Sequence, residues 1–273
     1  MLSVNILALT MIGGLGGLWA RHLNRHAFWG LLLPLHLGFA FSLCMDLTEI
    51  LQMCLALAAL LAWTQRRFWP AGLLLALSVL TKETSLLFAV AGVLVYCWER
   101  LRHIEPQQRT TAPVVFVLPL AAYVSWQIVL RQIWGQWPLL AGEHNLGVPF
   151  GGVMHLIASL LQSVDSDRAS FSLVVLIEIW TVFILAVAAA RRLPEMPLPR
   201  PLLVAWALYA LLAACLSYVV MSADVNFQRG LSELIVLCFI FLLAHSTARL
   251  RWSILVLQIA LVTMRIYIVS VSG

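Results

Sequence analysis

Charge is scarce in this chain, and lysine is almost absent. Charged residues make up 11% of the 273 residues, whereas an average soluble domain carries about 25%. Lys82 is the only lysine, and hydrophobic residues account for 62% of the chain. This composition argues against a soluble domain. It predicts an all-α fold, a polytopic transmembrane helical bundle that forms one domain over residues 1–273.

Paired cysteines and the common catalytic motifs are also missing. The chain has no Walker lysine motif, no GxGxxG after a strand, no HExxH and no GxSxG. Nucleotide-driven transport and zinc proteolysis therefore lose their usual signatures. The five cysteines are scattered without paired spacing, so neither a disulfide framework nor a zinc site is indicated. They are Cys44, Cys54, Cys97, Cys215 and Cys238.

The hydrophobic segments predict about ten membrane spans and one short apolar segment, 149–163, that is interfacial or re-entrant. Sorting the connections alternately places twelve arginines on one face and five basic residues on or near the other. Basic residues favour the cytoplasmic side, so the arginine-rich face is predicted to be cytoplasmic, and the +5 net charge needs no nucleic acid to explain it. The predicted spans are roughly 2–20, 27–45, 46–64, 70–81, 84–99, 113–134, 168–190, 201–220, 230–248 and 252–270.

Lys82 lies between two hydrophobic segments, in Thr81-Lys82-Glu83-Thr84. The preceding segment, 70–80, would span only about 16 Å as a helix, less than the hydrocarbon core of a bilayer. Non-helical backbone at membrane depth requires protein or a water-filled cavity around it. An ammonium at that depth also requires a partner or a task. The segment therefore predicts a polar cavity, open to one membrane face, with Lys82 and Glu83 in its wall.

Two further polar groups are predicted near the same face. Asp46, Glu49 and Gln52 have the spacing i, i+3, i+6, which places them on one face of a helix. The alternative is a helix cap followed by a solvated first turn. Arg229 and Glu233 have the spacing i, i+4, which fits a local salt bridge. The same spacing also fits an arginine that binds a phosphate group.

Residues 135–168 form the one sizeable loop predicted outside the membrane, with an interfacial helix inside it. A loop beside a cavity is where an acceptor substrate would be recognised, and Glu143 and His144 are candidates, the histidine as an acid–base group. Asp165 and Asp167 could hold a divalent cation through oxygen ligands. The commoner role for two such carboxylates is a helix cap or a solvated turn.

The predicted topology has an unusual start. The first helix must run from outside to inside, because Arg21 and Arg25 follow it and no basic residue precedes it. We therefore expect that an upstream helix and its outer loop have been lost. The alternative is a protein whose N-terminus naturally lies on the outer side of the membrane.

Four short motifs lie at the predicted outer face or at helix ends. They are Asp46-Leu47-Thr48-Glu49, Arg66-Arg67, Leu80-Thr81-Lys82-Glu83-Thr84 and Phe227-Gln228-Arg229. With these motifs the chain resembles bacterial GT-C-fold glycosyltransferases, most clearly over roughly 27–100. Those integral membrane enzymes use sugars linked to polyprenyl phosphate.

The resemblance implies an inverting glycosyl transfer on the periplasmic or extracellular face of the bacterial inner membrane. Lys82 and Arg229 would hold the lipid phosphate, and Asp46, Glu49 and Glu83 would complete the substrate site, Asp46 as a metal-binding or positioning residue. The family usually carries its acidic base in the first outer loop, so we expect the general base to lie outside this sequence. Two interpretations compete: a secondary transporter, and an inactive membrane fragment that serves as a scaffold.

Overall fold

The fold is entirely helical in the part of the chain that the computed structural model describes, residues 2–105, 109–138, 145–162, 166–191, 199–221, 230–245 and 247–272. In these ranges the one pairing of extended backbone is an isolated bridge between Leu146 and Leu216. The all-α class predicted from the composition is therefore confirmed.

The helices have the following bounds. They are α1 (Leu2–His22), η1 (Ala27–Leu32), α2 (Leu37–Cys44), α3 (Glu49–Thr64), α4 (Phe68–Thr81), η2 (Glu83–Ser85), α5 (Leu86–Leu101), α6 (Val114–Trp134), α7 (Gly151–Gln162), α8 (Ser166–Ala190), α9 (Arg200–Ala214), α10 (Tyr218–Met221), α12 (Ser232–His245) and α13 (Ala248–Ser272).

Three segments within the described ranges are long and apolar enough to cross a membrane: Leu2–His22, Glu83–Leu101 and Val114–Trp134. The ten spans predicted from the sequence are not confirmed. The clearest difference is at 27–45, where one span is predicted and the structure has the 3₁₀ helix η1 and the short helix α2. Pro34 lies between them, and a proline cannot supply the backbone N–H that a continuous helix needs there.

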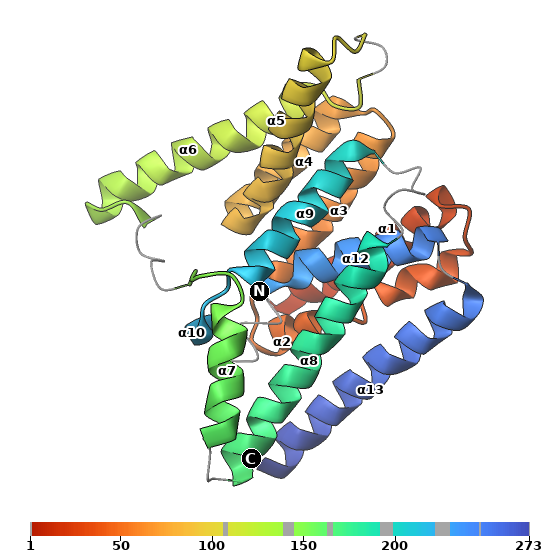
Figure 1. Ribbon diagram of the computed structural model, residues 1–273. Coiled ribbons are helices and arrows are strands. Elements are labelled where there is room, and N and C mark those ends of the chain that lie inside the picture. The colour runs from red at the N-terminus through yellow and green to blue at the C-terminus, as the bar shows by residue number, and fades with distance from the viewer. Residues whose placement is uncertain are drawn as a thin grey trace.

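The bundle is organised around two groups of helices. Figure 1 shows α3, α4, α5 and α9 side by side, with α7, α8 and α13 in the other half. Helix α12 packs against α8, α9, α1 and α3. Its residues from Leu234 to Leu243 are all buried, as expected for a helix that is apolar on every side. The core of the protein therefore surrounds α12.

A close backbone contact joins α1 to η1. A Cβ atom on Gly30 would lie 2.1 Å from the carbonyl carbon of Gly16, and a Cβ on Gly16 would lie 2.4 Å from the carbonyl oxygen of Gly30. Two glycines facing each other let the backbones approach closely, which is a common device in membrane helix packing. The contact fixes η1 against the C-terminal half of α1.

We expect Gly30→Ala to destabilise the protein by roughly 3 kcal/mol, because the added methyl group overlaps backbone atoms that cannot move aside. Gly14→Ala is the matched control in α1, since a Cβ there meets no atom within 4 Å. Denaturant midpoints of the two variants in detergent measure the difference. Equal midpoints would show that α1 and η1 do not pack as described.

Candidate functional site

Helix α4 stops at Thr81, and the chain is extended at Lys82 before it turns into η2. Lys82 has φ −157° and ψ 127°, while its N–H still donates to the carbonyl oxygen of Ser78 at 3.0 Å. The break predicted from the short hydrophobic segment is therefore present at the predicted residue. It turns the single lysine sideways out of α4, toward the neighbouring helices.

Lys82 lies between two buried carboxylates. Its Nζ atom is 3.9 Å from Oε1 of Glu49 and 3.9 Å from Oε1 of Glu233. The side chain of Lys82 is 15% exposed, and those of the two glutamates are 3% and 0% exposed. Each glutamate belongs to the first turn of its helix, α3 or α12, where the helix dipole favours negative charge. We call these three residues the ion cluster.

Hydroxyl groups complete the surroundings of both carboxylates. Ser42 donates to Oε2 of Glu49 at 3.4 Å. Thr84 donates through a short hydrogen bond to Oε1 of Glu233, and Ser232 donates to Oε2 of the same residue at 3.2 Å. Hydrogen bonds of this kind offset the cost of burying a charge. The ion cluster is thus built into the fold by hydroxyl groups from α2, η2 and the start of α12.

A second polar network holds the helix break itself. Gln52 in α3 donates from Nε2 to Oγ of Ser85 at 2.5 Å, and the hydroxyls of Ser78 and Ser85 lie 2.7 Å apart. Ser78 also lies 2.9 Å from the main-chain oxygen of Gln52, to which it donates. All three side chains are buried. On the other side, Tyr209 of α9 donates to the carbonyl oxygen of Thr84 at 2.9 Å. The turn that carries Lys82 is therefore fixed by α3 and α9.

The formal charge of the ion cluster is −1 when all three groups are ionised, since one ammonium faces two carboxylates. Removing one partner of a buried ion pair leaves an uncompensated charge, which is strongly destabilising. An anion that approaches Lys82 must compete with both glutamates.

Asp46 does not share a helix face with Glu49 and Gln52, and the prediction that it does is wrong. Helix α3 begins at Glu49, and Asp46 precedes it in a left-handed conformation with φ 53°. Its Oδ1 atom instead accepts a hydrogen bond from Nδ2 of Asn5 in α1 at 3.0 Å. Glu83 is exposed in η2, so it lies beside the ion cluster and outside its buried part.

Several predicted site residues lie where the structure describes no side chain. Arg229, Glu143, His144 and Asp165 lie outside the described residues, and Asp167 lies in α8, where its side chain is not described. Among the described residues, no group of three or more His, Cys, Asp and Glu side chains could hold a metal ion. The acceptor-loop and phosphate roles of these residues stay predictions.

The sequence reasoning missed the role of Glu233, which it paired only with Arg229. The available signal was an acidic residue directly before an unbroken apolar run, 234–244. A carboxylate at the start of a helix that is buried on all sides must itself be buried, and a buried carboxylate requires a partner. Lys82 is the partner that the fold supplies.

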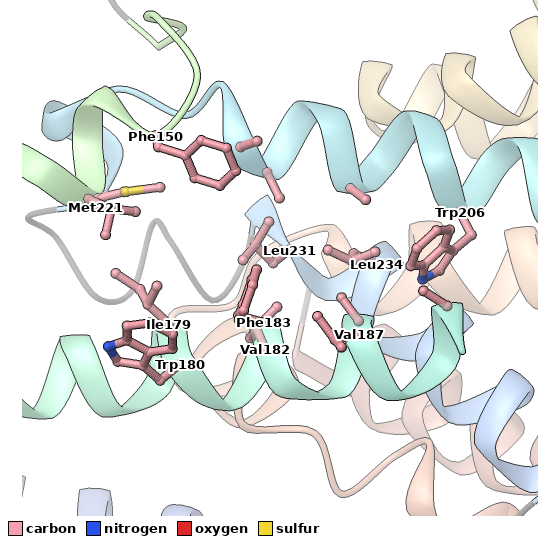
Figure 2. Close-up of a pocket in the computed structure, with 16 residues that line it drawn as sticks. Phe150, Ile179, Trp180, Val182, Phe183, Val187, Trp206, Met221, Leu231 and Leu234 are labelled. Carbon is pink, nitrogen blue, oxygen red and sulfur yellow. The ribbon is translucent and has the colours of Figure 1, made fainter. Parts of the chain in front are cut away.

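An apolar pocket of about 410 Å³ opens between α8 and α9. Figure 2 shows Trp206 at one end and Phe150 with Met221 at the other, while Leu231 and Leu234 form part of its wall. All of its lining residues are hydrophobic, and neither Lys82 nor Glu83 is among them. It therefore differs from the polar cavity around Lys82 that the sequence predicts. The remaining lining residues are Val153, Ile179, Trp180, Val182, Phe183, Ala186, Val187, Ala190, Ala210, Ala213 and Ala214.

The pocket and the ion cluster share the wall that α9 and α12 form. In α12, Leu234 lines the pocket and its neighbour Glu233 belongs to the ion cluster. In α9, Trp206 and Ala210 line the pocket, whereas Tyr209 bonds to the turn that carries Lys82. An apolar recess and a buried charged group thus lie on either side of one helix pair.

Comparison with known protein families, curated proteins and solved structures finds no match to this chain.

We expect Lys82→Gln to lower the free energy of unfolding by roughly 3 kcal/mol, because two buried glutamates lose their cation. The triple variant Lys82→Gln, Glu49→Gln, Glu233→Gln should recover most of this loss, since no charge remains in the ion cluster. Denaturant unfolding in detergent measures both. A triple variant no more stable than Lys82→Gln would contradict an electrostatic origin of the loss.

Proposed function

We propose that the protein is a membrane glycosyltransferase that moves a sugar from a polyprenyl-phosphate donor to an acceptor hydroxyl. The observation that carries this proposal is a single lysine, largely buried at a helix break between two carboxylates and one helix pair away from an apolar pocket. A lipid-linked donor likewise has a charged part, its phosphate, and an apolar part, its hydrocarbon chain. The resemblance of 27–100 to GT-C-fold glycosyltransferases supports the same reaction.

Lys82 would stabilise the charge that develops on the departing phosphate. Such stabilisation is strongest where the donor group is fixed in advance and water is excluded, and the network of Gln52, Ser78 and Ser85 fixes this turn. Both ion-pair distances are 3.9 Å, longer than the roughly 2.8 Å of a charge-assisted hydrogen bond. A phosphate oxygen that took the place of one carboxylate could approach the ammonium group more closely than either glutamate does.

In the proposed reaction the acceptor oxygen attacks the anomeric carbon, and the bond from that carbon to the phosphate oxygen breaks. The electron pair leaves with polyprenyl phosphate, and an acidic base removes the proton of the acceptor hydroxyl. Glu49 and Glu233 are engaged with Lys82, so we assign the base role to neither. We assign to the ion cluster the role of stabilising the leaving group.

The apolar pocket would hold part of the hydrocarbon chain of the donor. Alanines on facing sides of α8 and α9 create the space, since larger side chains there would close it. Burying apolar surface contributes about 25 cal/mol for each Å² removed from water, so a matching chain gains affinity from the lining alone. These alanines are Ala186, Ala190, Ala210, Ala213 and Ala214.

The proposal predicts opposite responses to two variants of the ion cluster. Glu233→Gln changes the formal charge from −1 to 0 and keeps the lysine, so polyprenyl phosphate should bind more tightly. Lys82→Gln with Glu233→Gln returns the charge to −1 without the cation, and binding should weaken by about tenfold to a hundredfold, with a matching loss of transfer. Titration of the purified protein with polyprenyl phosphate measures both.

Glu83→Gln is the matched control, because it removes one negative charge beside Lys82 from an exposed position. We expect it to change binding much less than either cluster variant. Polyprenyl-phosphate binding and sugar transfer that persist unchanged in the double variant would remove Lys82 from the site and end the proposal.

The two buried carboxylates beside a helix break favour a second candidate, a cation-coupled secondary transporter. Transporters also place buried charges at broken helices. In that case Glu233 would carry the coupling proton, and Glu233→Gln would abolish proton movement into proteoliposomes, as followed with a pH-sensitive dye. Wild-type proteoliposomes that move protons no faster than protein-free liposomes would exclude this candidate.

A further inference from the structure

A second charged region lies at the other end of α12. Arg25, in the turn after α1, donates from Nε to the carbonyl oxygen of Leu243 at 3.2 Å and from an Nη atom to that of Ala244 at 2.9 Å. These carbonyls belong to the last turn of α12, the negative end of its dipole. The guanidinium group is therefore held in place by main-chain atoms, about 16 Å along the helix from Glu233.

Arg251 lies beside this turn, at the start of α13. Its guanidinium carbon is 4.8 Å from the ring centre of Trp29, and the residue is 7% exposed. The ring of Trp29 also packs against Trp252 at 5.2 Å, and Phe28 packs against Trp252 at 5.8 Å. Phe28 and Trp252 are 41% and 51% exposed. A rim of aromatic rings thus lies beside a buried cation, as at membrane interfaces, where tryptophan is enriched.

The two chain segments that meet here carry positive charge only. All twelve acidic residues of the protein lie between Asp46 and Glu233, so residues 1–45 and 234–273 contain none. Burial lowers the pKa of Arg251, and the positive charge of Arg25 lowers it further. Arg21 and Arg249 are exposed on the same two segments. The fold thus brings basic residues of two distant segments to the same end of α12.

We propose that this region, formed by Arg21, Arg25, Arg249 and Arg251 with Phe28 and Trp252, binds the phosphate headgroup of an anionic phospholipid. Arginine matches phosphate in a forked, two-bonded geometry, and basic pockets between membrane helices recognise such headgroups. The exposed Arg21 and Arg249 would contact the headgroup, and the largely buried Arg251 would act through its charge. The rim of Phe28 and Trp252 places the region at the depth of the headgroups and favours a lipid over a soluble anion.

This site is independent of the proposed function, because it lies at the opposite end of α12 from the ion cluster. It would fix one end of the bundle to the membrane leaflet that carries anionic lipid. On the predicted topology that leaflet is the cytoplasmic one, because Arg21, Arg25, Arg249 and Arg251 belong to the arginine-rich face.

The test is a titration of the full-length protein in detergent with phosphatidylglycerol and, separately, with phosphatidylcholine, read by native mass spectrometry. The wild type should prefer phosphatidylglycerol. Arg249→Gln with Arg251→Gln should weaken that binding by roughly tenfold or more, and it leaves the Arg25 hydrogen bonds to α12 intact. Arg249→Gln alone changes an exposed side chain and should give a smaller loss in a protein that folds normally.

Arg66→Gln with Arg67→Gln is the matched control, since it also removes two positive charges from the predicted cytoplasmic face, at the turn between α3 and α4. We expect it to preserve the preference for phosphatidylglycerol. An equal loss in this control would show that diffuse positive charge attracts the anionic lipid and that no defined site binds it. Equal binding of the two lipids to the wild type would overturn the proposal, as would displacement of phosphatidylglycerol by an equal concentration of inorganic phosphate.

Discussion

The ion pair from Lys82 to Glu49 and Glu233 is the interaction on which the arrangement of this bundle depends. It joins three segments that are far apart in the sequence: the start of α3, the break after α4 and the start of α12. In an apolar bundle, packing alone tolerates many rotations of one helix against another. A buried charge that must face its partner tolerates few. The ion cluster therefore sets the rotation of α12, the helix around which the core is built.

Helix α12 has almost no other means of being positioned. Its residues from 234 to 244 carry no charged or hydrogen-bonding side chain apart from the thiol of Cys238, which accepts a hydrogen bond from Nε1 of Trp206 at 3.3 Å. The charged contacts described for this helix lie at its two ends. Glu233 lies at the positive end of its dipole, and Arg25 binds the carbonyls at the negative end. Both contacts are electrostatically favourable. An acidic anchor at one end and a basic anchor at the other also fix the direction in which the helix runs through the bundle.

Local features of this fold could be predicted from the sequence, and long-range ones could not. The break at Lys82 follows from a hydrophobic segment too short to cross a bilayer. The pairing of Lys82 with Glu233 joins residues 151 positions apart, and no local pattern indicates it. Asp46 was misplaced because its left-handed turn ends the helical register before α3 begins. Periodicity cannot detect such a turn, since it assumes a regular helix on both sides.

The apolar pocket and the ion cluster are connected through α9. Helix α9 presents Trp206 and Ala210 to the pocket and, on another side, Tyr209 to the carbonyl oxygen of Thr84. In the proposed reaction, a hydrocarbon chain in the pocket would press on α9, which holds the turn that carries Lys82. Occupation of the recess and the position of the lysine would then be linked through the hydrogen bond from Tyr209 to Thr84. For a substrate with a charged head and an apolar tail, this link would make binding of the tail favour the arrangement that receives the head.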